Sequence, residues 1–313
     1  MSKVGFIGAG KMGVGVTLNL LKAGHDCTVL IRQNRKFADE LAQAGATLTN
    51  NLNDCIAKQN VIFLCLPSIE AWQEITASIG ERANSGSVVV DLTSARPDLT
   101  VDLARSLAEQ EIGFVDAPML KGPPAARAGT IQLLVGGQNK DVNTVMPLLE
   151  VISEAQHLTG GSGTGHALKL LNNAVTLTNS AIVYETFALA ATMGIDLPLV
   201  HTAMRESAAG SKRLDAIAPV LISGEHPPSF DIGTALKDLE LYNDMARAEG
   251  TLTFAGGGAR SLYKMGQMLG LGDTPVTRLG EMLFDLNSGN IDNVGLPGSI
   301  SKSSKTAGSS SDA

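Results

Sequence analysis

The sequence predicts an α/β protein in which an N-terminal doubly wound parallel sheet is followed by an all-α C-terminal domain. The chain has 313 residues, a comfortable length for two domains because domains usually contain about 100–200 residues. Short β-branched runs alternate with amphipathic stretches over the first half, and only helical patterns follow Gly165. Glycine accounts for 34 residues, and two clusters of it, at 8–13 and 160–165, stand where each part begins.

The first half alternates predicted strands and helices. The strands are short, nearly continuous apolar runs, which are typical of a parallel sheet covered on both faces. They are Lys3–Ile7, Cys27–Ile31, Val61–Leu66, Val88–Asp91, Phe114–Ala117 and Ile131–Val135. The helical spacing of apolar residues between them predicts helices over Lys11–Ala23, Arg35–Ala44, Ala71–Ile79, Leu99–Glu109 and Lys140–Ile152. This alternation places helices on both faces of the sheet.

The second half contains helical patterns alone. A proline-free segment rich in leucine and alanine extends from Gly165 to about Met193 and predicts one long helix. Shorter helices are predicted over Leu197–Ser207, Ala216–Ile222, Thr234–Glu249, Gly258–Gly270 and Val276–Asn287. We therefore predict an α/β domain over 1–162 and an all-α domain over 163–295. The glycine motif at 8–13 makes the first the predicted dinucleotide-binding domain, and a family resemblance, both described below, implies that the second is a substrate and dimerisation domain. The serine-rich tail, 296–313, has too little apolar surface to fold and is predicted to be disordered.

Composition excludes several classes of protein. The chain is 44% hydrophobic and 18% charged, with a net charge of 24 − 31 = −7, which gives no basic footprint for a nucleic-acid partner. No apolar run approaches the roughly 18 residues that a membrane span needs. The three cysteines, Cys27, Cys55 and Cys65, form no close pair, so we expect a reducing compartment and a cytoplasmic location. The histidines lack metal-ligand spacing, and no metal site is predicted.

The first glycine cluster predicts a dinucleotide site. Residues 8–13 read G-x-G-x-x-G between a predicted strand and a predicted helix, which is the context that this motif requires. Gly8 allows the tight turn, Gly10 lets the backbone approach a pyrophosphate, and Gly13 lets the helix close on the strand. The pyrophosphate would lie at the helix N-terminus, beside Lys11 and Met12. The first domain is therefore predicted to be a Rossmann domain.

The end of the second strand bears on the choice between NAD and NADP. An NAD site usually has an acidic residue there, which holds the ribose hydroxyls. In this sequence the strand ends in Leu30-Ile31-Arg32, and no acid follows before Asp39. A guanidinium suits a 2′-phosphate, so NADP is the predicted cofactor. The alternative is that Arg32 is a solvated surface residue and that the cofactor is NAD.

The long helix carries a polar stripe near its beginning. Lys169 and Asn173 are four residues apart, so they are neighbours on one helix face, and Thr176 and Ser180 continue that face. The preceding glycine cluster is expected to open room for a ligand. In a hydride transfer, a lysine beside the substrate oxygen can act as general acid or base, and an amide can orient that oxygen. The alternative is a lysine that extends along an exposed helix face toward solvent.

Several motifs in order resemble the β-hydroxyacid dehydrogenase family. They are the N-terminal glycine loop, Asp116-Ala117-Pro118, and Phe230 followed by Lys237-Asp238-Leu239. The family's motif G-x-x-G-x-G-x-x-x-K-x-x-N-N is matched at every fixed position by Gly160, Gly163, Gly165, Lys169, Asn172 and Asn173. The similarity extends over residues 3–290.

This resemblance implies roles for individual residues. Lys169 would be the catalytic lysine, Asn173 would orient the substrate, and Asn172 would bind it. Lys237 would close the site beside the nicotinamide. Leu66, Pro67 and Thr93 would line the nicotinamide channel. The resemblance also implies a homodimer or homotetramer that interconverts a small β-hydroxy acid and its semialdehyde or keto form.

One motif departs from the family pattern and bears on the substrate. The family's D-A-P-V-S-G-G appears here as residues 116–122, in which Leu120 replaces the serine and Lys121 replaces a glycine. Met119, Leu120, Lys121 and Gly122 are predicted to line the substrate pocket, with Lys121 paired to an acid group of a small acidic substrate. The alternative is that Lys121 points to solvent.

Two rival functions remain open from the sequence. One is imine reduction by a related fold, and the other is a non-catalytic NADP-binding interaction module. Proteins of both kinds usually lack the lysine, so the presence of Lys169 together with Asn173 weighs against them. His166, one turn before Lys169, could contact substrate or cofactor.

Overall fold

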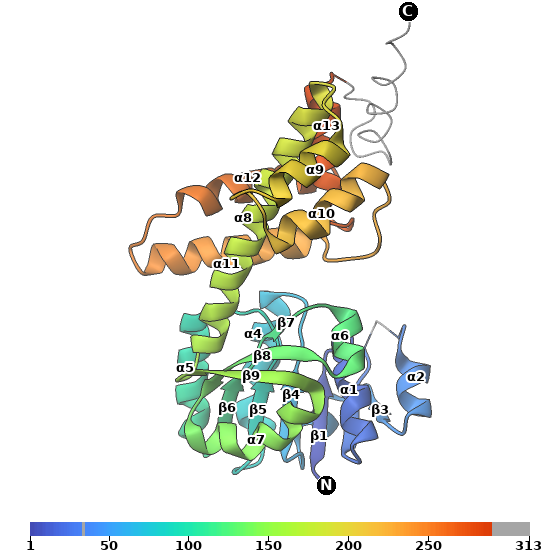
Figure 1. Ribbon diagram of the computed structural model, residues 1–313. Coiled ribbons are helices and arrows are strands. Elements are labelled where there is room, and N and C mark those ends of the chain that lie inside the picture. The colour runs from blue at the N-terminus through green and yellow to red at the C-terminus, as the bar shows by residue number, and fades with distance from the viewer. Residues whose placement is uncertain (33–34, 290–313) are drawn as a thin grey trace, which may run out of the picture. The chain divides into compact units, whose positions relative to one another are not determined.

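The computed structural model describes residues 1–32 and 35–289, and the chain divides into two compact units (Figure 1). The first unit is Met1–Leu170 and the second begins at Leu171, whereas the sequence predicted a boundary after residue 162. The predicted tail, 296–313, and the last residues of the predicted second domain lie outside the described residues.

The first unit is built on a mostly parallel sheet. Strands β1 to β6 lie in the order β3-β2-β1-β4-β5-β6 and are all parallel, which is the strand order of a Rossmann domain. Their bounds are Lys3–Ile7, Asp26–Leu30, Thr47–Thr49, Val61–Leu64, Val88–Asp91 and Gly113–Asp116. The register pairs Ile7 with Leu30 and Leu64, so the carboxyl ends of the central strands meet at one edge of the sheet. Cofactor sites of this fold lie at that edge.

The far side of the sheet departs from the wholly parallel arrangement that the sequence predicted. Strand β8, Ile131–Gly137, is antiparallel to β6 and also to the short β7, Met119–Leu120. Strand β9, Ser153–Gly160, is then parallel to β8. The connection between β6 and β8 holds the short strand β7, which pairs with β8, and only a six-residue helix, α6 Pro123–Ala128. A parallel crossover needs a connection of a dozen or more residues that is usually a longer helix.

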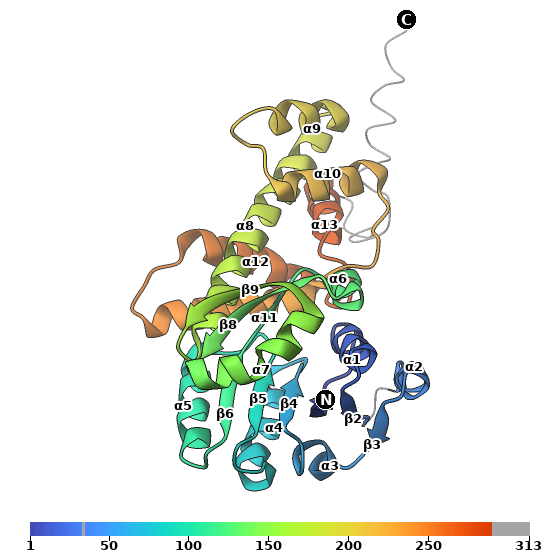
Figure 2. The same ribbon diagram turned by 60° about the horizontal axis from the view of Figure 1, so that its bottom comes forward.

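Helices cover both faces of this sheet. The first-unit helices are α1 Gly13–Lys22, α2 Ala38–Gln43, α3 Leu52–Ile56, α4 Ile69–Arg82, α5 Pro97–Ala108, α6 Pro123–Ala128 and α7 Asn139–Ile152. Neighbouring strand residues point to opposite faces: Phe6 and Phe63 pack with α1 and α7, whereas Ile7 and Ile62 pack with α3, α4 and α5. In Figure 2, α1 and α7 lie on one side of the sheet, and α3 and α4 lie on the other.

Apart from one isolated β-bridge between Asp231 and Pro275, the regular elements among the described residues of the second unit are all helices, as predicted. Helix α8 spans Thr164–Thr192 and begins within the first unit. The helices that follow are α9 Leu197–Arg205, α10 Lys212–Ser223, α11 Ile232–Ala248, α12 Phe254–Met268 and α13 Arg278–Asn287. They surround a core that includes Tyr184, Phe187, Leu239 and Tyr263. Among the described helices, none combines the length and the apolar character needed to span a membrane.

Candidate active site and its relatives

The glycine loop between β1 and α1 is shaped to receive a phosphate group. Gly8 has φ +108°, and a Cβ there would lie 2.1 Å from the carbonyl oxygen of Cys65. A Cβ on Gly13 would lie 2.2 Å from the oxygen of Gly8, whereas a Cβ on Gly10 would meet no atom within 4 Å. Gly8 and Gly13 are therefore required by the fold itself, and the space beside Gly10 is open. The backbone N–H groups of Lys11, Met12 and Gly13 lie at the N-terminal end of α1, where a helix leaves N–H groups without an acceptor of its own. This arrangement fits a pyrophosphate.

Arg32 lies two residues after the end of β2, because the strand ends at Leu30, one residue earlier than predicted. Its Nη1 lies 2.8 Å from Oε1 of Glu74, on α4, and both side chains are substantially exposed. An exposed ion pair of this kind contributes little to stability. The guanidinium can therefore exchange Glu74 for another anion at small cost.

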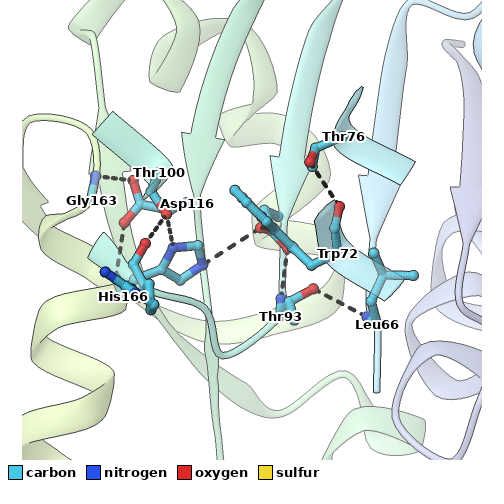
Figure 3. A network of polar contacts seen from close by, with 10 residues as sticks. Leu66, Trp72, Thr76, Thr93, Thr100, Asp116, Gly163 and His166 are labelled. Carbon is cyan, nitrogen blue, oxygen red and sulfur yellow. Dashed lines mark hydrogen bonds and ion pairs between the residues drawn. The ribbon is translucent and has the colours of Figure 1, made fainter. Parts of the chain in front are cut away.

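The residues predicted to line the nicotinamide channel lie together at the carboxyl ends of β4 and β5. The hydroxyl of Thr93 accepts a hydrogen bond of 3.1 Å from the backbone N–H of Leu66, the residue before Pro67. The backbone N–H of Thr93 donates to Oδ1 of Asp91 at 2.9 Å, and the indole N–H of Trp72 donates to Oδ2 of the same carboxylate. Asp91 is completely buried, so a buried carboxylate holds Trp72 and the loop of Thr93 together. Figure 3 labels Trp72, Thr93 and Leu66.

The beginning of α8 is held by a carboxylate from the sheet. Asp116, at the end of β6, accepts hydrogen bonds from the backbone N–H groups of Gly163 at 2.8 Å and His166 at 2.9 Å (Figure 3). A carboxylate in this position satisfies N–H groups that the first helical turn leaves unpaired, and it interacts favourably with the helix dipole. The position of the first turn of α8 is therefore set by the sheet.

The second glycine cluster, residues 160–165, lies where α8 begins against the sheet. A Cβ on Gly165 would lie 2.3 Å from the oxygen of Leu134, and one on Gly163 would lie 2.9 Å from the oxygen of Pro97. The expectation that this cluster opens room for a ligand is wrong for these two glycines, because the space beside them is filled by protein backbone. They instead let α8 begin close against β8 and α5.

The fixed helix turn brings Lys169 to the predicted substrate loop. Nζ of Lys169 donates to the backbone carbonyl of Met119 at 2.7 Å, across fifty positions of the chain. Met119 is buried and follows Asp116-Ala117-Pro118 directly. Within the first unit, the predicted catalytic lysine and the predicted substrate loop are thus in contact.

Lys121, in the same loop, takes a left-handed backbone conformation with φ 71°. Its ammonium lies 2.6 Å from Oε1 of Glu154, on β9, and 2.9 Å from the carbonyl oxygen of Thr130. This ammonium holds the pKa of the Glu154 carboxyl below its ordinary value, and Gln132 adds to the effect. Leu120 is half-buried, and Gly122 directly precedes α6. Lys121 therefore attaches the loop to β9 in this structure.

The second unit holds the remaining predicted site residues around one buried acid. Nδ2 of Asn173 donates to Oδ2 of Asp238 at 2.6 Å, and Nζ of Lys237 lies 3.3 Å from Oδ1 of the same carboxylate. Asn172 donates to Oδ1 of Asn173 at 3.0 Å. Asp238 is only 2% exposed, and it fixes the amide orientation of Asn173.

Sequence reasoning missed the acids that organise the site. Asp116 and Asp238 appeared only as members of motifs and Asp91 only as the last residue of a predicted strand, and none was predicted to hold a site residue. A signal for Asp238 did exist, since it stands between the core residues Ala235 and Leu239 on α11, where a charged residue is unusual unless it is paired.

Family models match both parts of the chain. Residues 3–161 match the NAD-binding domain of 6-phosphogluconate dehydrogenase, and residues 163–283 match the corresponding domain described for NADP-dependent 3-hydroxyisobutyrate dehydrogenase. No residue outside 3–283 is included in these matches.

Curated relatives and solved structures agree with the family models. The chain is 31% identical to 2-hydroxy-3-oxopropionate reductase of Escherichia coli, over 79% of this chain and 85% of that protein. It is 28% identical to 2-(hydroxymethyl)glutarate dehydrogenase of Eubacterium barkeri, over 86% of this chain and 91% of that one. The fold is similar to that of 3-hydroxyisobutyrate dehydrogenase of Mycobacterium tuberculosis with L-serine, at a TM-score of 0.83 and 22% identity, covering 90% and 99% of the two chains. The chain belongs to the β-hydroxyacid dehydrogenase family of NAD(P)-dependent oxidoreductases.

Proposed function

We propose that the protein interconverts a small β-hydroxy acid and its semialdehyde or keto form by hydride transfer, with Lys169 as the catalytic general acid or base. The observation that carries this proposal is the 2.7 Å contact between Nζ of Lys169 and the carbonyl of Met119, which presents the ammonium at the predicted substrate loop. The relatives' names, a reductase of 2-hydroxy-3-oxopropionate and a dehydrogenase of 2-(hydroxymethyl)glutarate, support a substrate that carries both a hydroxyl or carbonyl group and a carboxylate.

A bound nicotinamide would supply or accept the hydride. The loop 8–13 would hold the pyrophosphate, Leu66, Pro67 and Thr93 would line the nicotinamide channel, and Lys237 would close it. In the direction of reduction, negative charge develops on the carbonyl oxygen as the carbon gains hydride, and Lys169 Nζ delivers a proton to that oxygen. In the direction of oxidation, Lys169 removes the hydroxyl proton. Asn173, whose amide is fixed by Asp238, would orient the substrate.

The experiment that tests this function compares wild type with Lys169→Ala. Wild type should oxidise NADPH in the presence of 2-hydroxy-3-oxopropionate or a related semialdehyde, in a panel that varies the β-substituent. Lys169→Ala should lose about 1000-fold in kcat, in the range expected for a general acid, and keep its affinity for NADPH. Tight NADPH binding by wild type without turnover of any panel member would contradict the proposal and favour a non-catalytic binding module.

NADP is the proposed cofactor because Arg32 stands where an NAD site usually has an acid. Arg32→Ala should raise the Kd for NADPH about tenfold, the loss expected for one charge-assisted contact, and leave the Kd for NADH nearly unchanged. Glu74→Ala is the matched control, because it removes the partner of Arg32 in the exposed ion pair and keeps the guanidinium. An equal rise in the Kd for NADPH and the Kd for NADH in Arg32→Ala would contradict the proposed preference for NADP.

Two further proposals, on the residue that binds the substrate's acid group and on the oligomeric state, rest on the resemblance to the β-hydroxyacid dehydrogenase family. Lys121 is proposed to pair with the acid group by exchanging its contact with Glu154. A KM for acidic substrates that Lys121→Ala leaves unchanged would restrict this lysine to holding the loop. A homodimer or homotetramer is proposed, and the mass of the protein in solution tests it.

A further inference from the structure

The buried side chain of His166 stands out because the proposed reaction gives it no task. It lies on the first turn of α8, is completely buried, and contacts three elements of the first unit. Its Nδ1 shares a hydrogen bond of 2.8 Å with the hydroxyl of Thr100, on α5, and its Nε2 lies 3.8 Å from Oδ2 of Asp91. Its backbone N–H donates to Asp116 at 2.9 Å. His166 therefore contacts both buried carboxylates of the sheet edge, Asp91 through its ring and Asp116 through its backbone N–H. Figure 3 shows its contacts with Thr100 and Asp116.

The two carboxylates serve different parts of the proposed site. Asp91 binds the backbone N–H of Thr93, whose hydroxyl accepts from Leu66 on the proposed nicotinamide side. Asp116 holds the beginning of the helix that carries Lys169. His166 is the residue through which these two groups of contacts meet.

Stability alone is a poor explanation for this imidazole. Asp116 already satisfies the backbone N–H groups of Gly163 and His166, so the helix start does not need the ring. Among the described residues, Nε2 has no hydrogen-bond partner, and a buried polar atom in that state is costly. An apolar side chain of similar size would fill the space at a lower cost. The ring is better explained by what it holds in place.

The ring holds the first turn of α8, which directly precedes the turn that bears Lys169. Lys169 follows His166 by three residues, so the two lie on neighbouring turns of one helix face. Asp116 fixes the helix start along its axis, and the ring adds a second attachment, to α5 and toward β5, that resists rotation of the turn. A displacement of about 1 Å at a reacting group can cost on the order of 100-fold in rate.

We propose that His166 is a positioning residue that fixes the first turn of α8, and with it Lys169, relative to the loop of Thr93. The proposal rests on the proposed function for its kinetic consequence, but its structural part concerns the cofactor-free protein.

The test begins with amide hydrogen exchange of the cofactor-free full chain, followed by mass spectrometry on peptides covering 161–171. His166→Ala should raise exchange there by about tenfold or more, because local opening of the turn becomes easier. In turnover, His166→Ala should lower kcat on the order of 30-fold, with the KM for NADPH nearly unchanged, since geometry rather than binding is lost.

Two amide variants show whether the ring acts through its contacts. His166→Asn places an amide nitrogen near the position of Nδ1 and can keep the bond to Thr100, whereas His166→Gln extends an amide toward Asp91. The Asn variant should recover most of the exchange protection and of the kcat. Recovery by neither variant would overturn the proposal, because the ring would then act only by filling space. These near-isosteric variants also decide the question if His166→Ala does not fold.

His226→Ala is the matched control, because His226 is a second histidine with a largely buried side chain, 6% exposed, that bonds a threonine hydroxyl, at 2.7 Å from Oγ1 of Thr277. It should leave exchange over 161–171 and the kcat within about twofold of wild type, as expected for a site with no shared partners. An equal loss of kcat in both alanine variants would overturn the proposal. If wild type turns over no substrate, the proposed function fails, and the exchange measurements still decide the role of His166.

Discussion

Each unit of this protein buries one histidine between a threonine and a carboxylate, and the two arrangements use the same atoms. In the first unit, His166 lies 2.8 Å from Thr100 through Nδ1 and 3.8 Å from Asp91 through Nε2. In the second, His226 lies 2.7 Å from Thr277 through Nδ1 and 3.2 Å from Glu281 through Nε2. Similar hydrogen-bond chemistry therefore occurs twice in the chain.

The surroundings of the two histidines differ. His226 lies in the connection between α10 and α11 and attaches it to the beginning of α13, where Arg278 also binds Glu281. His166 stands on a helix turn whose backbone is bound to a second buried carboxylate, and Lys169 follows one turn later. A histidine placed like His226 holds parts of the fold together, whereas one placed like His166 can also hold a reactive group in place. The residue types alone do not distinguish the two cases.

The largest expected loss of stability follows from removing Asp116 in the first unit or Glu281 in the second. Asp116→Ala leaves the N–H groups of Gly163 and His166 without their acceptor, and Glu281→Ala removes the acid that binds Arg278 and His226. Each change should lower the free energy of unfolding by about 3 kcal/mol, since buried partners lose their hydrogen bonds or ion pairs. Urea unfolding measures this loss.

The same pair of variants separates stability from activity. Asp116→Ala should also lower kcat on the order of 100-fold because the turn before Lys169 is released, whereas Glu281→Ala should keep kcat under conditions in which it is folded. Steady-state kinetics at a temperature well below both unfolding midpoints makes the comparison. Equal losses of kcat would show that the two regions do not differ in the way proposed.

A smaller effect is expected from removing each threonine hydroxyl. Thr100→Val and Thr277→Val are nearly isosteric changes. Thr277→Val should cost about 1 kcal/mol, the contribution of one hydrogen bond. Thr100→Val should cost about 2 kcal/mol, because its hydroxyl also donates to the backbone carbonyl of Arg96 at 2.9 Å. Only Thr100→Val should lower kcat, by about threefold, because it weakens one of the two attachments of the His166 ring. Thermal unfolding and kinetics on both variants test this, and a fall in kcat with Thr277→Val would break the comparison.

The smallest expected difference between the two units is in the chemical labelling of the cysteine thiols. Burial raises the pKa of the Cys27 thiol, and that of Cys55, to about 12. The reactive thiolate forms only as the pH rises toward the pKa, so at pH 8 about one molecule in 10⁴ carries it. Alkylation at pH 8 should therefore modify the half-buried Cys65 first, and labelling of the other two should increase as the pH is raised.

All three cysteines lie in the first unit, so their labelling reports on that unit alone. His226→Ala should leave the labelling pattern as in wild type, as read by mass spectrometry of the alkylated protein. Rapid labelling of Cys27 or Cys55 in that variant would mean that loss of the second-unit histidine opens the first unit, and the two regions would then not be independent.

Much of the fold could be predicted because its pattern is local. The strands from β1 to β6, apart from β3, and the helices of the second unit follow from apolar periodicity, which depends only on nearby residues. Strand β9 escaped prediction because Ser153–Gly160 has a largely polar sequence and mostly exposed side chains. The short β3 and β7 were missed because they contain too few residues to show an alternation.

The candidate site could be predicted only where a motif carries it. Gly8 and Gly10 were identified from the spacing of their motif. The spacing of Lys169 and Asn173 placed them on one helix face, and the family resemblance implied their roles. Their partners were not, because Met119 lies fifty positions before Lys169, and Asp238 lies 65 positions after Asn173. Single-sequence patterns do not encode such distant pairs. The contact of Lys121 with Glu154 is of the same kind, since it joins residues 33 positions apart.

The hydrogen bonds from Gly163 and His166 to Asp116 have a consequence for the order in which the chain folds. Asp116 precedes the helix that it caps, so on the ribosome the strand is made before the helix emerges. Because domains generally fold as units and N-terminal ones first, the acceptor for the beginning of α8 can be in place when that helix is synthesised. The first unit then serves as the template on which the helical unit starts.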